Sequence, residues 1–491
     1  MRKLVAVVMA LAALAQHRPA QHPFAPIGGV SPFPANCDGD QSPSVHFPNS
    51  AVEPNIAVDP ANSNHLVGVW QQDRWNDGGS SGLMAAASVD GGRTWAASTA
   101  AFSVCTGGTY QRASDPWASL SPDGTAYQIA LVVRPGNLTG VLVSRSADGG
   151  FTWDPPIDLA IHPAGGDDKE SISADPNDAH YVYAAWDYAI SNNQYVTSFS
   201  RTVDGGATWE PVRTVYAPGP NGYTTGNLIL VLPNGDLVNV FAVQTETNGA
   251  VTFRVAVIRS QDHGATWSSP TFVASDQGIG VVNAKTQAPI RTGAGLPAAA
   301  VDPVSGAIYL VWEDGRFSGN QREGIALSKS LDGGVTWSVP VQVNQATNVQ
   351  AFTPNVAVNR DGAVAVTYYD FRQDTGPPDT LLANCWRIVS HDGGATWSET
   401  PVAAAFDILT APLTTRGPFL GDYQGLAAMG NRFMAFYVAA NSGNFSNPTS
   451  VFADSEDRLR DTRTTPAIEV NRHPGHPRIR EIKESKRPAR K

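Results

Sequence analysis

The residues of this sequence that could do chemistry are arginines, carboxylic acids and tyrosines that recur beside aromatic side chains. Three arginines closely follow an aspartate, and a fourth precedes one; Glu170 and Tyr423 stand at similar places before expected strands. Arginine binds carboxylates through paired hydrogen bonds, and mixed polar and aromatic side chains line sugar sites. The pattern therefore indicates a site for a polar sugar, including an anionic one. The residues concerned are Asp73-Arg74, Arg112-Ala-Ser-Asp115, Asp314-Gly-Arg316, Asp370-Phe-Arg372, Glu170 and Asp422-Tyr423.

The same pattern has a second interpretation. A loop of the form aromatic-Asp-x-Arg can be a structural clamp that recurs because the unit containing it recurs. Both interpretations stay open at the level of the sequence.

Motifs of several other chemistries are absent from the sequence. It contains no His-Glu-x-x-His, no phosphate-binding glycine loop followed by lysine, and no Gly-x-Ser-x-Gly. The ten histidines do not cluster. We therefore predict neither a metal site nor a cofactor.

The elements that must position these residues are marked by one eight-residue motif, Ser/Thr-x-Asp-x-Gly-x-Thr-Trp. Its Asp can accept hydrogen bonds from turn amides, its glycines can adopt positive φ, and its Trp can fix the turn to a sheet. We interpret the motif as a tight turn between two strands that stabilises the fold and takes no part in catalysis. The six copies are Ser88 to Trp95, Ser146 to Trp153, Thr202 to Trp209, Ser260 to Trp267, Ser330 to Trp337 and Ser390 to Trp397.

The spacing of the copies predicts the architecture. Their aspartates stand at positions 90, 148, 204, 262, 332 and 392, so the separations are 58, 56, 58, 70 and 60 residues. Each interval holds four short strand-like segments, which is typical of the four-stranded blades of a β-propeller. The sequence thus predicts an all-β protein with seven blades favoured and six as the alternative. In the seven-blade interpretation, Ser44 to Ser50 supplies the fourth strand of the last blade and joins the termini.

Strand order also predicts which rim carries function. All six motif turns join a third to a fourth strand, so they lie on one rim of the propeller. The loops that contain the arginines and acids lie on the opposite rim, where residues from several blades can converge. We expect Arg74, Arg112, Arg316 and Arg372 to face a central funnel there.

Composition divides the chain into four parts. Residues 1–15 read as a signal peptide, with Arg2-Lys3 before a short apolar run and a small-residue cleavage site. Residues 16–44 are irregular, 45–460 form the propeller, and 461–491 form a basic tail without apolar periodicity. No other segment is long and apolar enough to be a transmembrane span. We expect an exported protein, secreted or periplasmic.

Charge argues against one class of partner. The formal net charge is −10, and the basic tail leaves the rest of the chain more acidic still. An acidic body does not favour nucleic acid as a partner, whereas a glycan or glycoconjugate stays compatible with it.

The chain has three cysteines, Cys37, Cys105 and Cys385. In an oxidising compartment one pair can form, and we favour Cys37 with Cys105, which leaves Cys385 over. Three separate thiols remain the alternative. Their spacing does not match a metal site.

The six motifs resemble the Asp-box, or BNR repeat, of the sialidase superfamily, over about residues 45 to 460. The resemblance implies a sialidase-like propeller, and an exo-alpha-sialidase holds its substrate's carboxylate with three arginines. It also implies a Tyr nucleophile activated by a Glu, and an Asp acid/base. The positions that match here are Arg74, Arg112, Arg316 and Arg372 for the clamp, Tyr423 with Glu170 for the nucleophile pair, and Asp115 for the acid.

One position departs from the family pattern. Sialidases carry Arg-Ile-Pro, or close to it, at the start of the first blade, where this chain reads Glu53-Pro54-Asn55-Ile56. Two functions therefore follow as hypotheses. One is an exported sialidase-like glycoside hydrolase acting on terminal sugars; the other is a non-catalytic propeller that binds glycans or proteins at the cell surface.

Overall fold

Residues 25–39, 43–136, 138–191, 193–455 and 468–469 are described by a computed structural model. The only helices among them are three short 3-10 turns, η1 (Val104–Thr106), η2 (Gly315–Ser318) and η3 (Ile408–Thr410). The predicted all-β class is confirmed. Within these residues no helix combines the length and apolar character needed to cross a membrane.

Six four-stranded antiparallel sheets follow one another along the chain, and in each the eight-residue motif joins the third strand to the fourth. We call them blades one to six. Blade one holds β1 (His46–Val58), β2 (Leu66–Trp75), β3 (Ser80–Ser88) and β4 (Trp95–Ser98). Blade two holds β5 (Arg112–Leu120), β6 (Ala126–Arg134), β7 (Leu138–Ser146) and β8 (Ile157–Ala160). Blade three holds β9 (Asp167–Ala174), β10 (Val182–Ser191), β11 (Gln194–Thr202) and β12 (Arg213–Tyr216).

The second half of the chain repeats this order. Blade four holds β13 (Tyr223–Val231), β14 (Leu237–Thr247), β15 (Ala250–Ser260) and β16 (Thr271–Ser275). Blade five holds β19 (Ala298–Val301), β20 (Ile308–Asp314), β21 (Gly324–Ser330) and β22 (Val341–Gln342). Blade six holds β23 (Ala351–Val358), β24 (Val364–Asp370), β25 (Leu382–Ser390) and β26 (Ser398–Pro401).

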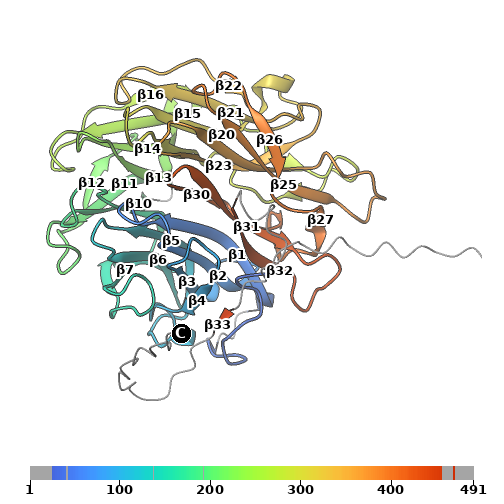
Figure 1. Ribbon diagram of the computed structural model, residues 1–491, viewed down its shortest axis with the longest axis horizontal. Coiled ribbons are helices and arrows are strands. Elements are labelled where there is room, and N and C mark those ends of the chain that lie inside the picture. Colours follow the sequence, from blue (N-terminus) through green and yellow to red (C-terminus); the bar gives the residue numbers. More distant parts are fainter. Residues whose placement is uncertain (1–24, 40–42, 137, 192, 456–467, 470–491) are drawn as a thin grey trace, which may run out of the picture.

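A further antiparallel sheet, blade seven, closes the ring without a motif turn. It holds β30 (Gly425–Met429), β31 (Arg432–Ala440) and β32 (Thr449–Ser455). Within the described chain, the first strands β1, β5, β9, β13, β19, β23 and β30 contact one another in cyclic order, and β30 touches both β23 and β1. In Figure 1 the colours accordingly run around the centre, so that dark red β30 and β31 return to blue β1.

Short pairings lie between and beside the blades. They are β17 (Val281–Val282) with β18 (Pro289–Ile290), β28 (Leu413–Thr414) with β29 (Gly417–Pro418), β27 (Phe406–Asp407) with β25, and β33 (Ile468–Glu469) with β4.

The segment that closes the ring differs from the one predicted. His46 to Ser50 forms the start of β1 and pairs mainly with β2; it meets β32 at one parallel pair, Ser50 and Thr449. The antiparallel neighbour of β32 is instead the earlier segment, where the amide of Ile27 donates to the Val451 carbonyl at 2.8 Å. The prediction for Ser44 to Ser50 therefore holds at one residue only: Ser50 places β1 beside β32, and the antiparallel pairing along the edge of β32 comes from the segment around Gly28.

The second strands explain why the sequence folds into blades. In blades one and five they read Leu66 to Trp70 and Ile308 to Trp312, which are continuous apolar runs. Every residue of β2 and β20 is buried, since neighbouring blades cover both faces of these strands. A strand covered on both faces has no polar alternation, and this burial is the main force that stacks the blades.

The motif turns are held as their sequence suggests. In the copy from Ser330 to Trp337, the Asp332 carboxylate accepts the Thr336 amide at 2.9 Å and the Thr336 hydroxyl at 2.6 Å. These bonds lower the pKa of Asp332 to about 2. The Trp337 indole donates to the Gly334 carbonyl at 3.2 Å. The motif therefore satisfies its own polar groups within the turn.

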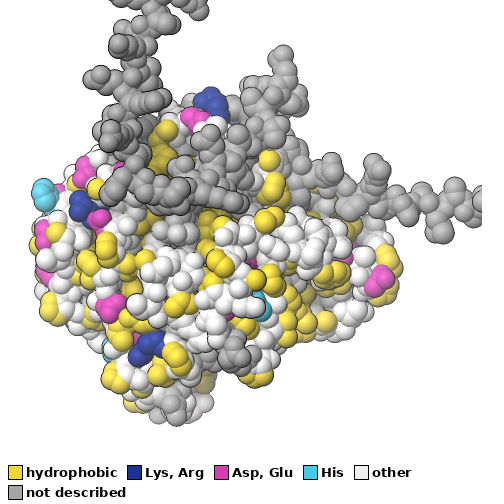
Figure 2. Space-filling model, turned by 90° about the horizontal axis from the view of Figure 1, so that it is seen from below, with side chains coloured by type: hydrophobic (Ala, Val, Ile, Leu, Met, Phe, Trp, Pro, Cys, Tyr) yellow, Lys and Arg dark blue, Asp and Glu magenta, His cyan; other side chains and the backbone are white. Residues whose placement is uncertain are grey.

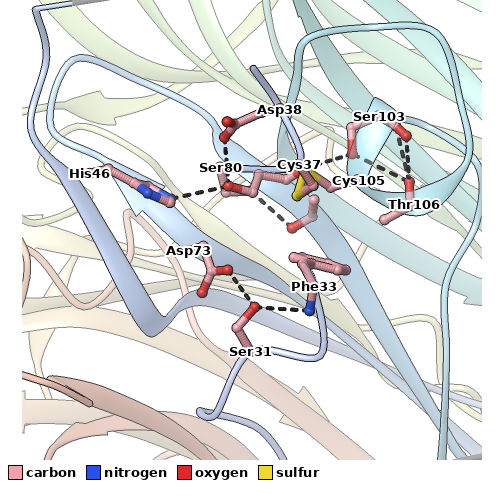
Figure 3. Close-up of a disulfide and its surroundings, with 12 residues drawn as sticks. Ser31, Phe33, Cys37, Asp38, His46, Asp73, Ser80, Ser103, Cys105 and Thr106 are labelled. Atoms are coloured by element: carbon pink, nitrogen blue, oxygen red, sulfur yellow. Dashed lines mark hydrogen bonds between the residues drawn. A yellow bond between two sulfur atoms is a disulfide. The ribbon is translucent and has the colours of Figure 1, made fainter. Parts of the chain in front are cut away.

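A disulfide between Cys37 and Cys105 fastens the segment before β1 to the loop after β4, and the favoured pairing is confirmed. Figure 3 shows Asp38 and His46 beside it. The same segment is also held by the Ser31 hydroxyl, which donates to Asp73 at 2.5 Å. Cys385 is a buried free thiol.

The face of the molecule that Figure 2 shows from below carries little charge. In the described part of that face hydrophobic side chains are frequent, and Lys, Arg, Asp and Glu side chains are few and scattered. Because only 16% of the residues are charged, a cluster of charges elsewhere in the molecule stands out.

We predict that Asp332→Ala lowers the free energy of unfolding by roughly 1–2 kcal/mol, because the turn loses its acceptor at a solvent-exposed site. Equilibrium denaturation measures the loss. Any activity of the protein should survive in the folded variant. A variant that kept its stability but lost activity would show that the motif acts in function.

We predict that Cys105→Ser lowers the free energy of unfolding by about 2–4 kcal/mol in non-reducing buffer, since the disulfide closes a loop spanning 68 positions. Urea denaturation measures the change. The double variant Cys37→Ser/Cys105→Ser should be no less stable than the single one. Equal stability of the wild type and Cys105→Ser would contradict the bond's structural role.

Candidate functional site

Bulges shape the first strands at one rim. Register shifts interrupt β1, β5, β9, β13 and β23 close to the end where each strand begins. The residue at each shift has a left-handed backbone, which is uncommon for residues other than glycine, and a bulge turns its side chain out of the regular alternation. The residues and their φ angles are Glu53 (52°), Asp115 (50°), Lys169 (52°), Gly226 (69°) and Thr353 (48°).

Lys169 lies at the centre of a cluster of carboxylates. Its Nζ is 2.8 Å from Asp115, 2.9 Å from Asp422 and 3.7 Å from Glu53. These acids come from blade two, from the loop before β30 and from blade one, so the lysine joins three parts of the ring. Burial acts to lower the pKa of Lys169, but the surrounding carboxylates raise it well above its ordinary value. The ammonium therefore stays charged.

Asp422 receives a second cation. Arg291 binds it with two hydrogen bonds, from Nε at 3.1 Å and from Nη2 at 2.7 Å. Burial opposes ionisation of Asp422, but Lys169 and Arg291 hold its pKa well below its usual range. The exposed Arg416 adds a weaker contact at 3.9 Å.

Glu53 and Arg74 are linked through Gln71. Nη1 of Arg74 donates to the Gln71 side-chain oxygen at 2.6 Å, and the Gln71 amide donates to Glu53. Burial and the nearby Asp115 raise the pKa of Glu53 to about 7. The Arg74 guanidinium lies 5.0 Å from the Phe419 ring centre, so its apolar face is also covered.

Glu170 differs from the other acids of the cluster. Its side chain is buried, and neither carboxyl oxygen accepts a hydrogen bond from another residue. Burial and Asp115 raise the pKa of Glu170 well above its ordinary value. For Asp115, burial acts in the same direction, but Lys169 and the Ser114 hydroxyl lower its pKa. The site thus holds two acids whose surroundings shift their pKa in opposite directions.

Two neighbouring cavities are lined by most of these groups, and Asp115 and Lys169 line both. We call them the channel and the mouth. The channel also holds Trp117, Glu170, Asn227, Leu228, Leu296, Pro297, Ala298, Ala299, Pro354, Asn355, Asp422 and Tyr423. The mouth also holds Arg74, Asn76, Asp77, Asp168, Arg291, Thr415 and Arg416.

The two cavities differ in size. The channel has a volume of about 70 Å³ and the mouth about 310 Å³. On this scale one water needs about 10–15 Å³, so the channel holds roughly five waters, comparable to one sugar ring, and the mouth several times more.

Among the described residues no group of three or more His, Cys, Asp or Glu side chains is arranged to hold a metal ion.

The structure brings together some of the predicted site residues. Asp115, Glu170 and Tyr423 line the channel, and Arg74 lines the mouth. Tyr423 and Glu170, the expected nucleophile pair, line the same cavity without a hydrogen bond between them, and the tyrosine hydroxyl donates to the Pro116 carbonyl at 3.2 Å. Burial and the nearby carboxylates raise the pKa of Tyr423 well above its ordinary value. The ring instead packs edge-on against Trp117, at 5.2 Å between ring centres.

The predicted convergence of four arginines is wrong for three of them. Arg316 binds Asp314 of its own blade at 2.7 and 2.8 Å, and Arg372 binds Asp370 of its own blade at 2.6 Å. Arg112 binds Asp77 at 2.8 Å and lies 4.3 Å from the Trp75 ring centre. Arg316 and Arg372 therefore fit the interpretation as structural clamps, because each guanidinium forms an ion pair with the Asp at the end of its own strand.

Sequence reasoning missed Lys169 and Arg291. Arg291 lies directly after β18 in an insertion between blades four and five, which explains the long 70-residue interval between aspartates 262 and 332. The length of that interval is the sequence feature from which an insertion between these two blades could have been predicted. Lys169 is one of four consecutive charged residues at the start of β9, but nothing in its spacing shows that its carboxylate partners lie in other blades.

Comparison with known families agrees with the resemblance seen in the motifs. Residues 182–407 match the family described as BNR repeat-like domain. This region contains four of the six motif turns, at Thr202, Ser260, Ser330 and Ser390. The predicted BNR-repeat resemblance is confirmed there.

Two curated relatives are xyloglucanases. The chain is 26% identical to one from Paenibacillus sp over 271 residues, which cover 50% of this chain and 24% of that protein. It is 28% identical to one from Hypocrea jecorina (strain QM6a) over 234 residues, covering 42% of this chain and 24% of that protein. The chain therefore spans about a quarter of the length of these relatives.

Solved structures with a similar outline include a Hadza microbial sialidase, at 17% identity, with 79% of this chain and 76% of that chain covered and a TM-score of 0.46. Another is an alpha-L-arabinanase of Penicillium chrysogenum, at 16% identity, with 70% and 93% covered and a TM-score of 0.45.

Proposed function

We propose that the protein is a glycoside hydrolase whose reaction takes place where the channel meets the mouth. The observation that carries the proposal is the pair of carboxyl groups, Glu170 and Asp115, which line one cavity and whose pKa values are shifted in opposite directions by their surroundings. Glycosidases need one protonated acid and one carboxylate beside the scissile bond. Environments that push two pKa values apart assign these roles.

In the proposed reaction Glu170 is the general acid. Its proton passes to the glycosidic oxygen as the bond from that oxygen to the anomeric carbon breaks. The Asp115 carboxylate takes a proton from a water, whose oxygen bonds to the anomeric carbon. Lys169, at 2.8 Å, keeps Asp115 ionised and in place. Tyr423 and Trp117 offer an aromatic surface for the sugar ring, a role that replaces the nucleophile implied by the family resemblance.

A second candidate is a non-catalytic propeller that binds glycans or proteins. Arg316 and Arg372 favour it, because each is paired with its own blade's Asp and neither reaches the central cavities. In this case Glu170 would be a buried acid without a chemical role.

We also propose that the protein is exported. The signal-peptide pattern of residues 1–15, which lie outside the described residues, motivates this, and the disulfide between Cys37 and Cys105 supports an oxidising compartment.

The test compares Glu170→Gln with Glu313→Gln. Glu313 is a matched control, since it is also fully buried with a pKa raised to about 8 by burial and Glu323, yet it lines neither cavity. Glu170→Gln should lower kcat by roughly 10²–10⁴-fold on a glycoside with a poor leaving group. The loss should be far smaller on a 2,4-dinitrophenyl glycoside, because 2,4-dinitrophenolate leaves without needing a proton. Glu313→Gln should keep wild-type kcat.

Equal kcat for the wild type and Glu170→Gln on both substrates would contradict the assignment. Failure of the wild type to hydrolyse any of a broad panel of aryl glycosides, with retained binding of a glycan, would favour the second candidate.

A further inference from the structure

We infer that the channel takes one uncharged sugar unit from the end of a glycan, and that the site rejects sugars that carry a carboxylate. This inference rests on the proposed function for its chemistry. It concerns the kind of sugar that the site accepts, and three separate observations lead to it.

The first observation is the charge of the site. Two of the buried cations near the shared wall already have carboxylate partners: Lys169 has three, and Arg291 has Asp422. An incoming carboxylate would have to displace one of these partners. Arg74 donates to the neutral Gln71 side chain and keeps a buried Nε without an acceptor, beside the acidic Glu53 that Gln71 also contacts. An incoming carboxylate would also approach Asp115, which is ionised. Binding an acidic sugar would therefore cost free energy, because a buried carboxylate without a cation partner, or next to another carboxylate, is unfavourable.

The second observation is the division of the channel into two walls. One wall carries Asp115, Lys169, Glu170 and Asp422, and it comes from blades two, three and seven. The opposite wall, from blades four to six, is largely apolar. It consists mainly of Leu228, Leu296, Pro297, Ala298, Ala299 and Pro354, with Asn227 and Asn355 at its ends. A sugar ring with one polar edge and one carbon-rich face matches both walls, whereas a charged substituent finds no partner on the second wall.

The third observation is the size and enclosure of the channel. Its volume of about 70 Å³ corresponds to roughly one sugar ring, and the first strands of the blades surround it. A sugar inside a glycan chain has links on two sides and could enter only if the chain doubled back. The end of a chain can enter directly and leave the following units in the larger mouth. The bond to be cleaved would then lie beside Asp115 and Lys169, which line both cavities.

The exposed Arg416 is the cation of the mouth that could still attract an anion. Its side chain is 64% exposed, and its nearest contact to Asp422 is 3.9 Å. It therefore offers a control, because removing it tests whether any binding of an acidic sugar comes from the rim and not from the channel.

The experiment compares kcat/KM for matched 4-methylumbelliferyl glycosides that differ by one carboxylate. The pairs are glucoside with glucuronide and galactoside with galacturonide, in both anomeric forms, together with neutral pentosides and a sialoside. We expect the preferred neutral substrate to exceed every acidic one by at least tenfold in kcat/KM. Arg416→Ala should not lower that ratio, because it removes an attraction for anions at the rim and leaves the channel intact. An acidic sugar turned over as fast as the neutral ones would overturn the inference.

A binding measurement separates this inference from the proposed function. Calorimetry with the corresponding methyl glycosides needs no turnover and uses the wild type and Glu170→Gln. If no substrate is hydrolysed but a neutral glycoside binds at least tenfold more tightly than its acidic partner, the hydrolase proposal fails and the inference stands. If the acidic partner binds equally well or better, or if no neutral glycoside binds at all, the inference fails.

Discussion

The ion cluster around Lys169 is the interaction on which the arrangement of the site depends. One ammonium group lies within 3.7 Å of carboxylates from blade one, from blade two and from the loop that leads into blade seven. Two partly or fully buried charges of the same sign repel strongly where water is excluded, so these acids could not share one place without a cation between them. Arg291 adds the second positive charge that Asp422 requires. The inner rim is thus held together by charge, while the rest of the ring is held by apolar burial.

This cluster explains both the backbone and the chemistry of the rim. Glu53, Asp115 and Lys169 adopt left-handed backbone angles that cost on the order of 1 kcal/mol each for residues other than glycine. The bulges turn their side chains toward one another, and the ion contacts offset the backbone cost. The same cluster makes the pKa of Glu170 differ from that of Asp115. Lys169 contacts the aspartate at 2.8 Å, whereas the glutamate has no hydrogen-bond partner in another residue. The raised pKa of Glu170 and the lowered pKa of Asp115 follow from this asymmetry.

The sequence predicted the fold far better than the site. The repeated turns and apolar strands act locally, so the all-β class could be read directly, and Asp115, Glu170 and Arg74 were assigned to the functional rim because strand order fixes that rim. The error over Arg316 arose because a guanidinium next to its own Asp314 satisfies itself, which spacing alone does not reveal. The role of Lys169 was missed because its partners lie in other blades. Contacts between blades depend on backbone bulges of a single residue, and a pattern of residue types does not encode them.

The stability of Lys169→Met, measured by equilibrium denaturation at pH 3 and pH 8, tests the central role of this charge most directly. Met has a similar length and no charge, and Lys285→Met, which removes a lysine paired with Asp374 at a more exposed place, is the control. Lys169 lowers the pKa of Asp115 and Asp422 below the ordinary value of 3.8, so its stabilising effect is fully present above that value and is lost as the pH falls below it. The account predicts a loss on the order of 3 kcal/mol at pH 8, a clearly smaller loss at pH 3, and under about 1 kcal/mol for the control. An equal loss at both pH values, or none, would contradict it.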